Sequence, residues 1–165
     1  MNTEKGFTLI EVLLYIAIIG MIIQGFIIFV LSIASTNSKT YVVQEVQANT
    51  RIALDMISQK IRAADDVITP SEGNSTSTLI LDMPDPSPNL TFSIIDGVLG
   101  IIEGVASSTP ITSNEVNISI LTFTNLAPVG EKDNIKIEIT AIYRTGESKE
   151  FQYSQTLQTS VSLRK

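Results

Sequence analysis

The stretch Phe7-Thr8-Leu9-Ile10-Glu11 opens an apolar run that decides the fold of the N-terminal part of the chain. From Val12 to Ser38 there are 27 residues without a charge, and apolar residues dominate as far as Ala34. An α-helix rises about 1.5 Å per residue and a bilayer core is roughly 30 Å thick, so about 20 apolar residues cross a membrane. The run is therefore long enough to form a membrane-spanning helix.

Glu11 places a carboxylate at the mouth of this run. Moving an acid to the centre of a membrane helix costs on the order of 2.5–3.5 kcal/mol on insertion scales, so such a residue usually has a partner. If the chain were cut after Gly6, Phe7 would carry a new positive amine four residues upstream of Glu11. The sequence therefore offers this new amine as a partner for the carboxylate.

The heptapeptide Lys5-Gly6-Phe7-Thr8-Leu9-Ile10-Glu11 resembles the type IV prepilin signal, a short leader ending in Lys-Gly or Arg-Gly before Phe-Thr-Leu-Ile-Glu and an apolar helix. The resemblance implies that the prepilin peptidase cuts between Gly6 and Phe7 on the cytoplasmic side of the membrane. It also implies that the new amine of Phe7 is methylated. In this family the carboxylate at the position of Glu11 pairs with the N-terminal amine of a neighbouring subunit during filament assembly.

Two further stretches resemble minor pilins and minor pseudopilins. Residues 51–64 read Arg-x-Ala-Leu-x-x-Ile and then Ile-Arg-x-Ala, and residues 157–165 close with a Leu-Arg pair. Many major pilins kink the helix with a proline, whereas residues 7–69 of this chain contain none. We interpret Arg51 and Arg62 themselves as solvated helix positions.

The resemblance implies a structural subunit of a type IV pilus-like filament, a type II secretion pseudopilus or a DNA-uptake filament. The implied partners are the prepilin peptidase, other pilin or pseudopilin subunits and the inner-membrane assembly machinery. Before assembly the subunit would cross the inner membrane once, with its head outside the cytoplasm. After assembly it would lie in a cell-surface or periplasmic filament.

An ordinary secretory signal peptide is the alternative interpretation of the N-terminus, because Ser32-Ile33-Ala34 offers small residues for signal peptidase. However, Val12 to Ala34 is 23 residues, against roughly 7–15 for a typical apolar region of a signal peptide. An uncleaved signal anchor is the second alternative.

The composition restricts the chemistry of the chain. With 11 basic residues and a net charge of −6, direct nucleic-acid binding is not expected, because such binding depends on phosphate neutralisation. There is no Cys and no His, which removes disulfides, thiolates, imidazole catalysis and His-ligated zinc. The sequence shows no catalytic constellation, and we expect no enzyme activity and no cofactor.

A metal would have to be a hard cation on oxygen ligands. Three acidic pairs were considered as calcium ligands, but they lack the regular spacing of a dedicated loop and are interpreted as solvated turn carboxylates: Asp82 with Asp85, Asp65 with Asp66, and Glu131 with Asp133. Gly97, Gly100 and Gly104 are interpreted as turn glycines and not as a phosphate-binding loop, because no helix start follows them. No metal site is predicted.

Beyond Ala34 apolar residues recur mostly every third or fourth position, which is the pattern of an amphipathic helix. They are Val42, Val46, Ala53, Ile57, Ile61, Ala64 and Ile68. Pro70 disfavours continuation of the helix. The sequence predicts one helix from Phe7 to about Ile68: residues 1–6 form a leader, 7–34 the membrane or filament-core half, and 35–69 the amphipathic half.

From residue 70 to 165 the period changes from 3.6 to 2, which predicts a β-rich head. Asp96-Gly97 between two apolar stretches is a strong hairpin signal, and Thr145-Gly146 predicts another turn. Six mostly antiparallel strands are expected near residues 79–83, 90–95, 98–102, 116–123, 135–141 and 151–163. Their apolar face needs a cover, and the amphipathic half of the helix supplies it. The predicted fold class is α+β, a long helix packed against an antiparallel sheet.

Three classes of function remain open at this point. The favoured one is the filament subunit. The second is a single-span membrane-anchored binding domain or adhesin that never polymerises and for which the helix is only a tether. A membrane-anchored enzyme is the third and is disfavoured by the absence of His and Cys.

Overall fold

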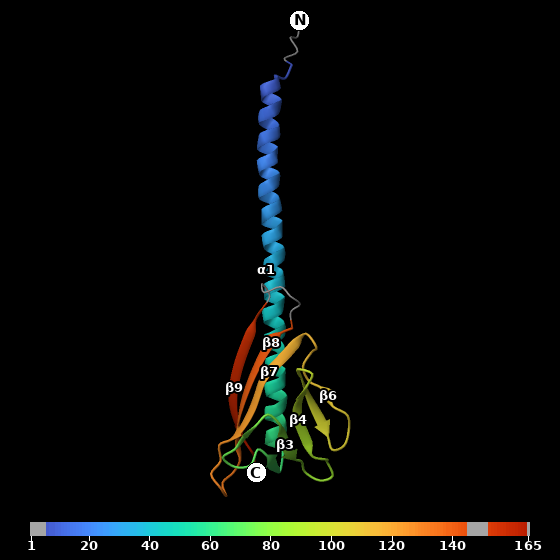
Figure 1. Cartoon of the computed structure of the whole chain (residues 1–165), viewed down its shortest axis with the longest axis vertical. Coiled ribbons are helices and arrows are strands. Elements are labelled where there is room, and N and C mark those ends of the chain that lie inside the picture. Colours follow the sequence, from blue (N-terminus) through green and yellow to red (C-terminus); the bar gives the residue numbers. More distant parts are fainter. Residues whose placement is uncertain (1–5, 145–151, 165) are drawn as a thin grey trace. The chain divides into compact units, whose positions relative to one another are not determined.

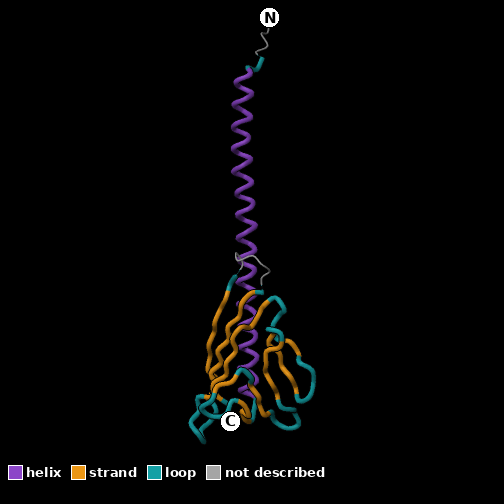
Figure 2. Tube along the Cα trace, viewed as in Figure 1, coloured by secondary structure: helices purple, strands orange, loops and turns teal. Residues whose placement is uncertain are grey.

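The computed structural model describes residues 6–144 and 152–164. By its internal contacts the chain divides into two compact units, Met1–Thr40 and Tyr41–Lys165. The described residues form one helix, α1 (Leu9–Ala63), and nine strands. Figure 1 labels these elements along the chain, and Figure 2 separates helix, strands and loops by colour. The α+β class predicted from the sequence is confirmed.

The first half of α1 is a helix without cover from the rest of the chain. Every residue from Val12 to Thr40 is exposed, including the large apolar side chains between Val12 and Ile33. Within the described part of the chain, α1 is the one helix long and apolar enough to cross a membrane, judged by length and composition. Exposed apolar surface of this extent is unfavourable in water, so lipid or other protein must cover it.

The second half of α1 buries one stripe. Its buried residues follow a spacing of mostly three or four: Val42, Val46, Asn49, Thr50, Ala53, Leu54, Ile57 and Ile61. Arg51 and Arg62 lie on the exposed side, as the sequence suggests. The amphipathic pattern therefore places one face of this half against the sheets (Figure 1).

The predicted end of the helix at about Ile68 is wrong, because α1 ends at Ala63 and residues Asp66–Thr69 form strand β1. The amide of Asp65 donates to the carbonyl of Asp82 at 2.9 Å, and Val67 pairs with Leu81. The backbone thus exchanges helical hydrogen bonds for sheet hydrogen bonds. Strand alternation then buries Val67 and leaves Ile68 47% exposed, which reverses the helical expectation for Ile68.

One sheet has five strands in the order β1-β3-β4-β5-β6, all antiparallel. Its further members are β3 (Leu79–Asp82), β4 (Leu90–Ile95), β5 (Val98–Glu103) and β6 (Thr109–Pro110). Asp96 and Gly97 join β4 to β5 with positive φ angles of 52° and 78°, the signature of a type I′ hairpin turn. The predicted hairpin is confirmed.

The second sheet has four strands in the order β2-β7-β8-β9, also antiparallel. They are β2 (Ser75–Thr76), β7 (Val116–Asn125), β8 (Asn134–Tyr143) and β9 (Ser154–Ser162). A bulge between Ile118 and Ile120 shifts the register of β7. Ile120 is consequently exposed, and Leu121 and Phe123 are buried, so strict alternation from Val116 through Ile120 does not hold.

The other predicted strands lie close to the observed ones. In β8, Ile135, Ile137 and Ile139 are fully buried, and in β9 the odd-numbered residues face inward as far as Leu163. The prediction of one sheet of six strands misses β1 and the two-residue strands β2 and β6, and it misses the division into two sheets. The turn predicted at Thr145-Gly146 and the predicted strand residue Phe151 lie outside the described residues.

A single apolar core joins α1 to both sheets. Its fully buried side chains include Ile57 and Ile61 from α1, Phe92 from β4 and Phe123 from β7. Two hydrogen bonds link the β4–β5 turn to the second sheet: Ile118 N donates to Gly97 O at 2.8 Å, and Arg144 Nη2 donates to Asp96 O at 2.7 Å. The head, Tyr41–Lys165, therefore folds around one core.

Candidate functional site

Thr8 caps the N-terminus of α1. Its carbonyl accepts the amides of Glu11 at 3.1 Å and Val12 at 3.2 Å, and its hydroxyl accepts the Glu11 amide at 3.4 Å. The order Thr-x-x-Glu ahead of an apolar run is the sequence signature of a capping box. Thr8 is therefore the residue that fixes where the helix begins, and Glu11 occupies the first turn, near the positive end of the helix dipole.

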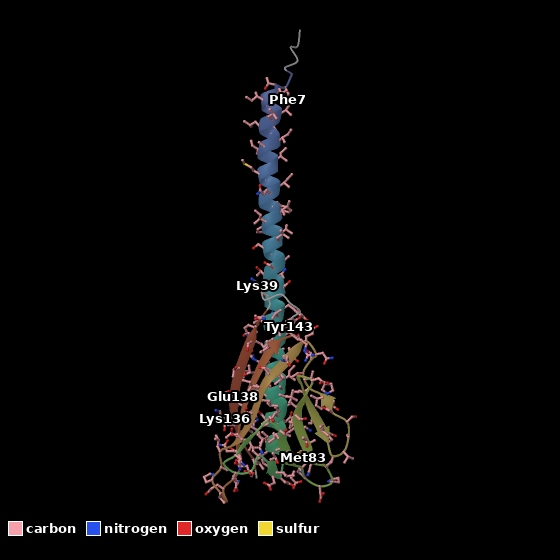
Figure 3. The ribbon with its side chains drawn as sticks, in the orientation of Figure 1. Phe7, Lys39, Met83, Lys136, Glu138 and Tyr143 are labelled. Carbon is pink, nitrogen blue, oxygen red and sulfur yellow. The ribbon has the colours of Figure 1, made fainter. Side chains whose placement is uncertain are left out.

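The side chain of Glu11 has one partner one turn along the helix. The hydroxyl of Tyr15 donates to Glu11 Oε1 at 3.4 Å. The ring of Tyr15 meets the ring of Phe7 edge to face, with centroids 6.4 Å apart and planes at 71°. Phe7 itself is 75% exposed and lies just before the start of α1 (Figure 3).

Residues 6–38 contain no Lys, Arg or His. No cationic side chain in this part of the helix can therefore neutralise Glu11. The amine that cleavage after Gly6 would create on Phe7 is the nearest positive charge that the sequence can supply, four residues upstream. A carboxylate without a cation of its own is suited to pairing with an amine, either on its own chain or on a neighbour.

Gly6, Phe7 and Glu11, the residues singled out from the sequence, thus lie together at the start of α1. Lys5, the last basic residue of the leader, lies outside the described residues. Sequence reasoning missed Thr8 and Tyr15. The first could have been found from the Thr-x-x-Glu signature, and the second from the four-residue spacing to Glu11, which brings two side chains to one helix face.

A second group of polar residues lies inside the head, between α1 and the loop before β7. Asn49 is buried, and its Nδ2 donates to Glu45 Oε1 at 2.8 Å. Its Oδ1 accepts the Ser113 amide at 2.7 Å, and the Ser113 hydroxyl donates to Glu45 Oε1 at 2.9 Å. These bonds satisfy polar groups that packing removes from water, so the cluster positions α1 on the head.

Two tyrosines near this cluster have raised pKa values. The Tyr41 hydroxyl donates to Glu115 Oε2 at 2.9 Å, and this hydrogen bond, followed by the negative charge of Glu115, raises the pKa of Tyr41. Burial is the first cause that raises the pKa of Tyr143, followed by the charges of Glu115 and Glu45. Both hydroxyls therefore stay protonated at neutral pH and can act as hydrogen-bond donors.

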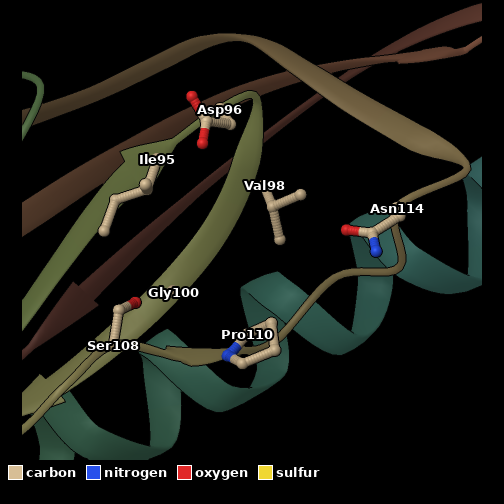
Figure 4. A pocket seen from close by; sticks show the side chains of 7 residues that line it. All are labelled: Ile95, Asp96, Val98, Gly100, Ser108, Pro110 and Asn114. Carbon is tan, nitrogen blue, oxygen red and sulfur yellow. The ribbon is translucent and has the colours of Figure 1, made fainter.

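The head also has a shallow cavity of about 220 Å³ beside the β4–β5 turn (Figure 4). It is lined by Ile95, Asp96, Val98, Gly100, Ser108, Pro110 and Asn114. Asp96 is its one ionisable side chain, and Ser108 has no base beside it in this lining. The arrangement offers no pair of groups for acid–base or nucleophilic chemistry.

A smaller cavity of about 180 Å³ has three acidic residues in its lining, Asp66, Glu72 and Asp133. The Asp133 carboxylate accepts Asn125 Nδ2 at 2.5 Å, and the Glu72 carboxylate accepts the Gly130 amide at 3.1 Å. Across residues 6–144 and 152–164, no three His, Cys, Asp or Glu side chains gather closely enough to hold a metal ion. The interactions that are seen tie loops together.

Residues 1–23 match the family described as the prokaryotic N-terminal methylation motif. Searches of the curated proteins and of the solved structures found no match. With the long apolar helix and the antiparallel sheets, the motif supports a type IV pilin-like family. It points to a structural subunit that is processed by the prepilin peptidase and assembles with other pilins, and it is consistent with anchoring of the chain in a membrane.

Proposed function

We propose that the chain is a minor pilin or minor pseudopilin of a type IV pilus-like filament, a type II secretion system or a DNA-uptake machine. The prepilin peptidase cuts between Gly6 and Phe7, and the Phe7 amine is methylated. The first half of α1 sits in the inner membrane and later in the core of a filament beside related subunits. The head, outside the cytoplasm, then faces outward.

One observation carries this proposal: a single carboxylate, Glu11, begins an apolar segment that the rest of the chain leaves exposed. A simple membrane tether has no use for a charge at that place, and the charge makes insertion less favourable. A filament subunit does have a use for it. In a low-dielectric setting an unpaired carboxylate is costly and a paired one is tolerable, so the amine of a neighbour sets the register of assembly.

The experiment compares processing with incorporation in the native host. We expect Glu11→Ala and Glu11→Gln to be inserted and cleaved normally but to enter filaments poorly, because both lose the charge and the second keeps the shape. Tyr15→Phe is the matched control, since it removes the hydroxyl that bonds Glu11 and keeps the carboxylate. Cleavage is followed by mass spectrometry, and incorporation by shearing and cross-linking.

The competing function is a membrane-anchored binding domain or adhesin that does not polymerise. Normal incorporation of both Glu11 variants would remove the charge-pairing argument. Complete absence of the wild-type chain from sheared filaments would favour the tether.

A further inference from the structure

Strand β9 is an open edge of the four-stranded sheet. It pairs with β8 along Ser154–Ser162 without a register shift, and among the described residues no strand pairs with its other side. Figure 1 shows β9 at the outer side of β8. The even-numbered residues of the strand are all exposed, so no described loop covers them.

The hydrogen bonds at the two ends of β9 show which backbone groups face outward. Leu163 N donates to Asp133 O at 3.2 Å, and Tyr143 N donates to Tyr153 O at 3.1 Å. Residues that bond to β8 therefore have odd numbers in β9, and antiparallel strands alternate bonding and non-bonding pairs. The N–H and C=O groups directed away from β8 belong to Ser154, Thr156, Gln158, Ser160 and Ser162.

The other three edges of the two sheets are protected in ways that natural proteins use against strand pairing. Strand β2 has two residues, and β6 has two residues of which one is Pro110. Strand β1 has four residues, an exposed Asp66 and a bulge between Val67 and Thr69. By contrast, β9 has nine residues, Ser-Gln-Thr-Leu-Gln-Thr-Ser-Val-Ser, without a charge or a proline.

The side chains of β9 offer a pattern that a further strand can continue. Its exposed face carries only hydroxyl and amide side chains. On the core side Tyr153 and Leu157 are half-buried and pack against the edge of the core. A strand added outside β9 with an apolar residue at every second position would cover these two side chains and keep its polar residues in water.

We propose that the outer edge of β9 is a docking site for an extended segment of another protein, which adds to the sheet as a further strand. The ligand is a stretch of about five or more residues with alternating apolar and polar side chains, because five outward residues are available and main-chain hydrogen bonds supply the affinity. The other edges of this chain are too short to fill nine residues. This inference rests on the head alone and is independent of the proposed function.

The test uses the full-length protein in detergent micelles and a defined probe, an acetylated and amidated peptide with the sequence of residues 134–143. This sequence is chosen because it already pairs with the inner side of β9, with Ile135, Ile137 and Ile139 toward the core. Amide hydrogen exchange is measured by NMR with and without peptide. We expect exchange to slow by at least about tenfold at the outward amides, Thr156, Gln158 and Ser160, with no change at the odd-numbered amides.

A first pair of controls alters the protein. Gln158→Pro removes one outward N–H without removing a bond to β8, and proline is tolerated at such edge positions. Gln158→Thr keeps the N–H. Binding should be lost in the first variant and retained in the second, while exchange at the odd-numbered amides shows that both remain folded.

A second pair of controls alters only the peptide, so that protein folding is not in question. N-methylation of the peptide residues Lys136 and Glu138, or of Ile137 and Ile139, removes the N–H groups along one side of the peptide strand. One of these peptides should lose binding and the other keep it. Strands that pair antiparallel through solvent-facing positions predict loss with the first, and parallel pairing predicts loss with the second.

Three outcomes overturn the proposal. The first is unchanged exchange at the outward amides at saturating peptide. The second is equal binding of both methylated peptides. The third is protection that rises with protein concentration alone, which would assign the edge to a second copy of the chain.

Discussion

Asn49 Oδ1 accepts the backbone amide of Ser113 at 2.7 Å, a bond that joins the middle of the head's helix to a loop 64 residues further along the chain. Asn49 is 7% exposed, so both groups have given up water to form it. A buried donor that loses its partner costs the desolvation energy of that group. The pair therefore fixes the position of this loop on α1.

Asn49→Ala should lower the free energy of unfolding of a fragment beginning at residue 35 by about 1–3 kcal/mol, because it leaves the Ser113 amide buried without an acceptor. Gln44→Ala is the control, since Gln44 is exposed on the same helix and such surface changes usually stay within about 0.5 kcal/mol. Urea denaturation measures both. Equal costs for the two variants would show that the hydrogen bond contributes nothing particular.

Removal of residues 1–34 should leave a soluble fragment of mixed helix and sheet, because the buried stripe of the second half of α1 stays covered. In that fragment Ile57→Ala and Ile61→Ala should each cost about 2–5 kcal/mol, the usual effect of truncating a buried aliphatic side chain. Ile52 is 52% exposed on the same helix, and Ile52→Ala serves as the matched control. Losses below about 0.5 kcal/mol for both buried positions would contradict the packing.

Gly97→Ala should destabilise the head more than Gly73→Ala does. Both glycines have positive φ, 78° and 73°, so both substitutions introduce backbone strain. A Cβ at Gly97 would also lie 1.9 Å from Asn117 Oδ1, whereas nothing lies within 4 Å at Gly73. The difference between the two midpoints of thermal unfolding therefore measures the steric part, and a larger loss at Gly73 would contradict the turn geometry.

The head should lose stability in alkaline solution through Tyr41. Its pKa is raised above the ordinary value of 10.0 by the hydrogen bond to Glu115, so the folded state holds the phenol proton more tightly than the unfolded state. This contribution is fully present below pH 10 and is lost as the pH rises through the folded-state pKa.

Glu115→Gln should lower the pKa of Tyr41 toward its ordinary value, because it removes the charge that opposes ionisation. The pKa of Tyr143 should fall less, since burial is the first cause of its shift. NMR titration of the tyrosine rings follows each residue separately. An unchanged titration of Tyr41 in this variant would show that Glu115 is not the cause.

Much of the fold could be predicted because its signals are local. The apolar run from Val12, the three-and-four spacing through Ile61, and the Asp96-Gly97 turn each depend on neighbours in sequence. The end of α1 could not, because Val67 and Ile68 continue an apolar pattern that fits helix or strand. Pairing of β1 with β3 decides between the two, and that contact is distant in sequence.

The bulge in β7 and the division into two sheets escaped for the same reason. Ile118 and Ile120 share one parity, and only the partner strand β8 shows that the register shifts between them. At the start of α1, Gly6, Phe7 and Glu11 could be singled out from their motif. Thr8 and Tyr15 act through hydrogen bonds to Glu11, and their spacing from it was the available signal.

The mass of the mature N-terminus tests the central claim, that this chain is a processed pilin-like subunit, most directly. The protein is isolated from the membranes of its native host, digested, and its N-terminal peptide is identified by mass spectrometry. The account predicts a peptide that begins at Phe7 and carries a methyl group on its amine. A terminus at Met1, or one directly after Ala34, would contradict it.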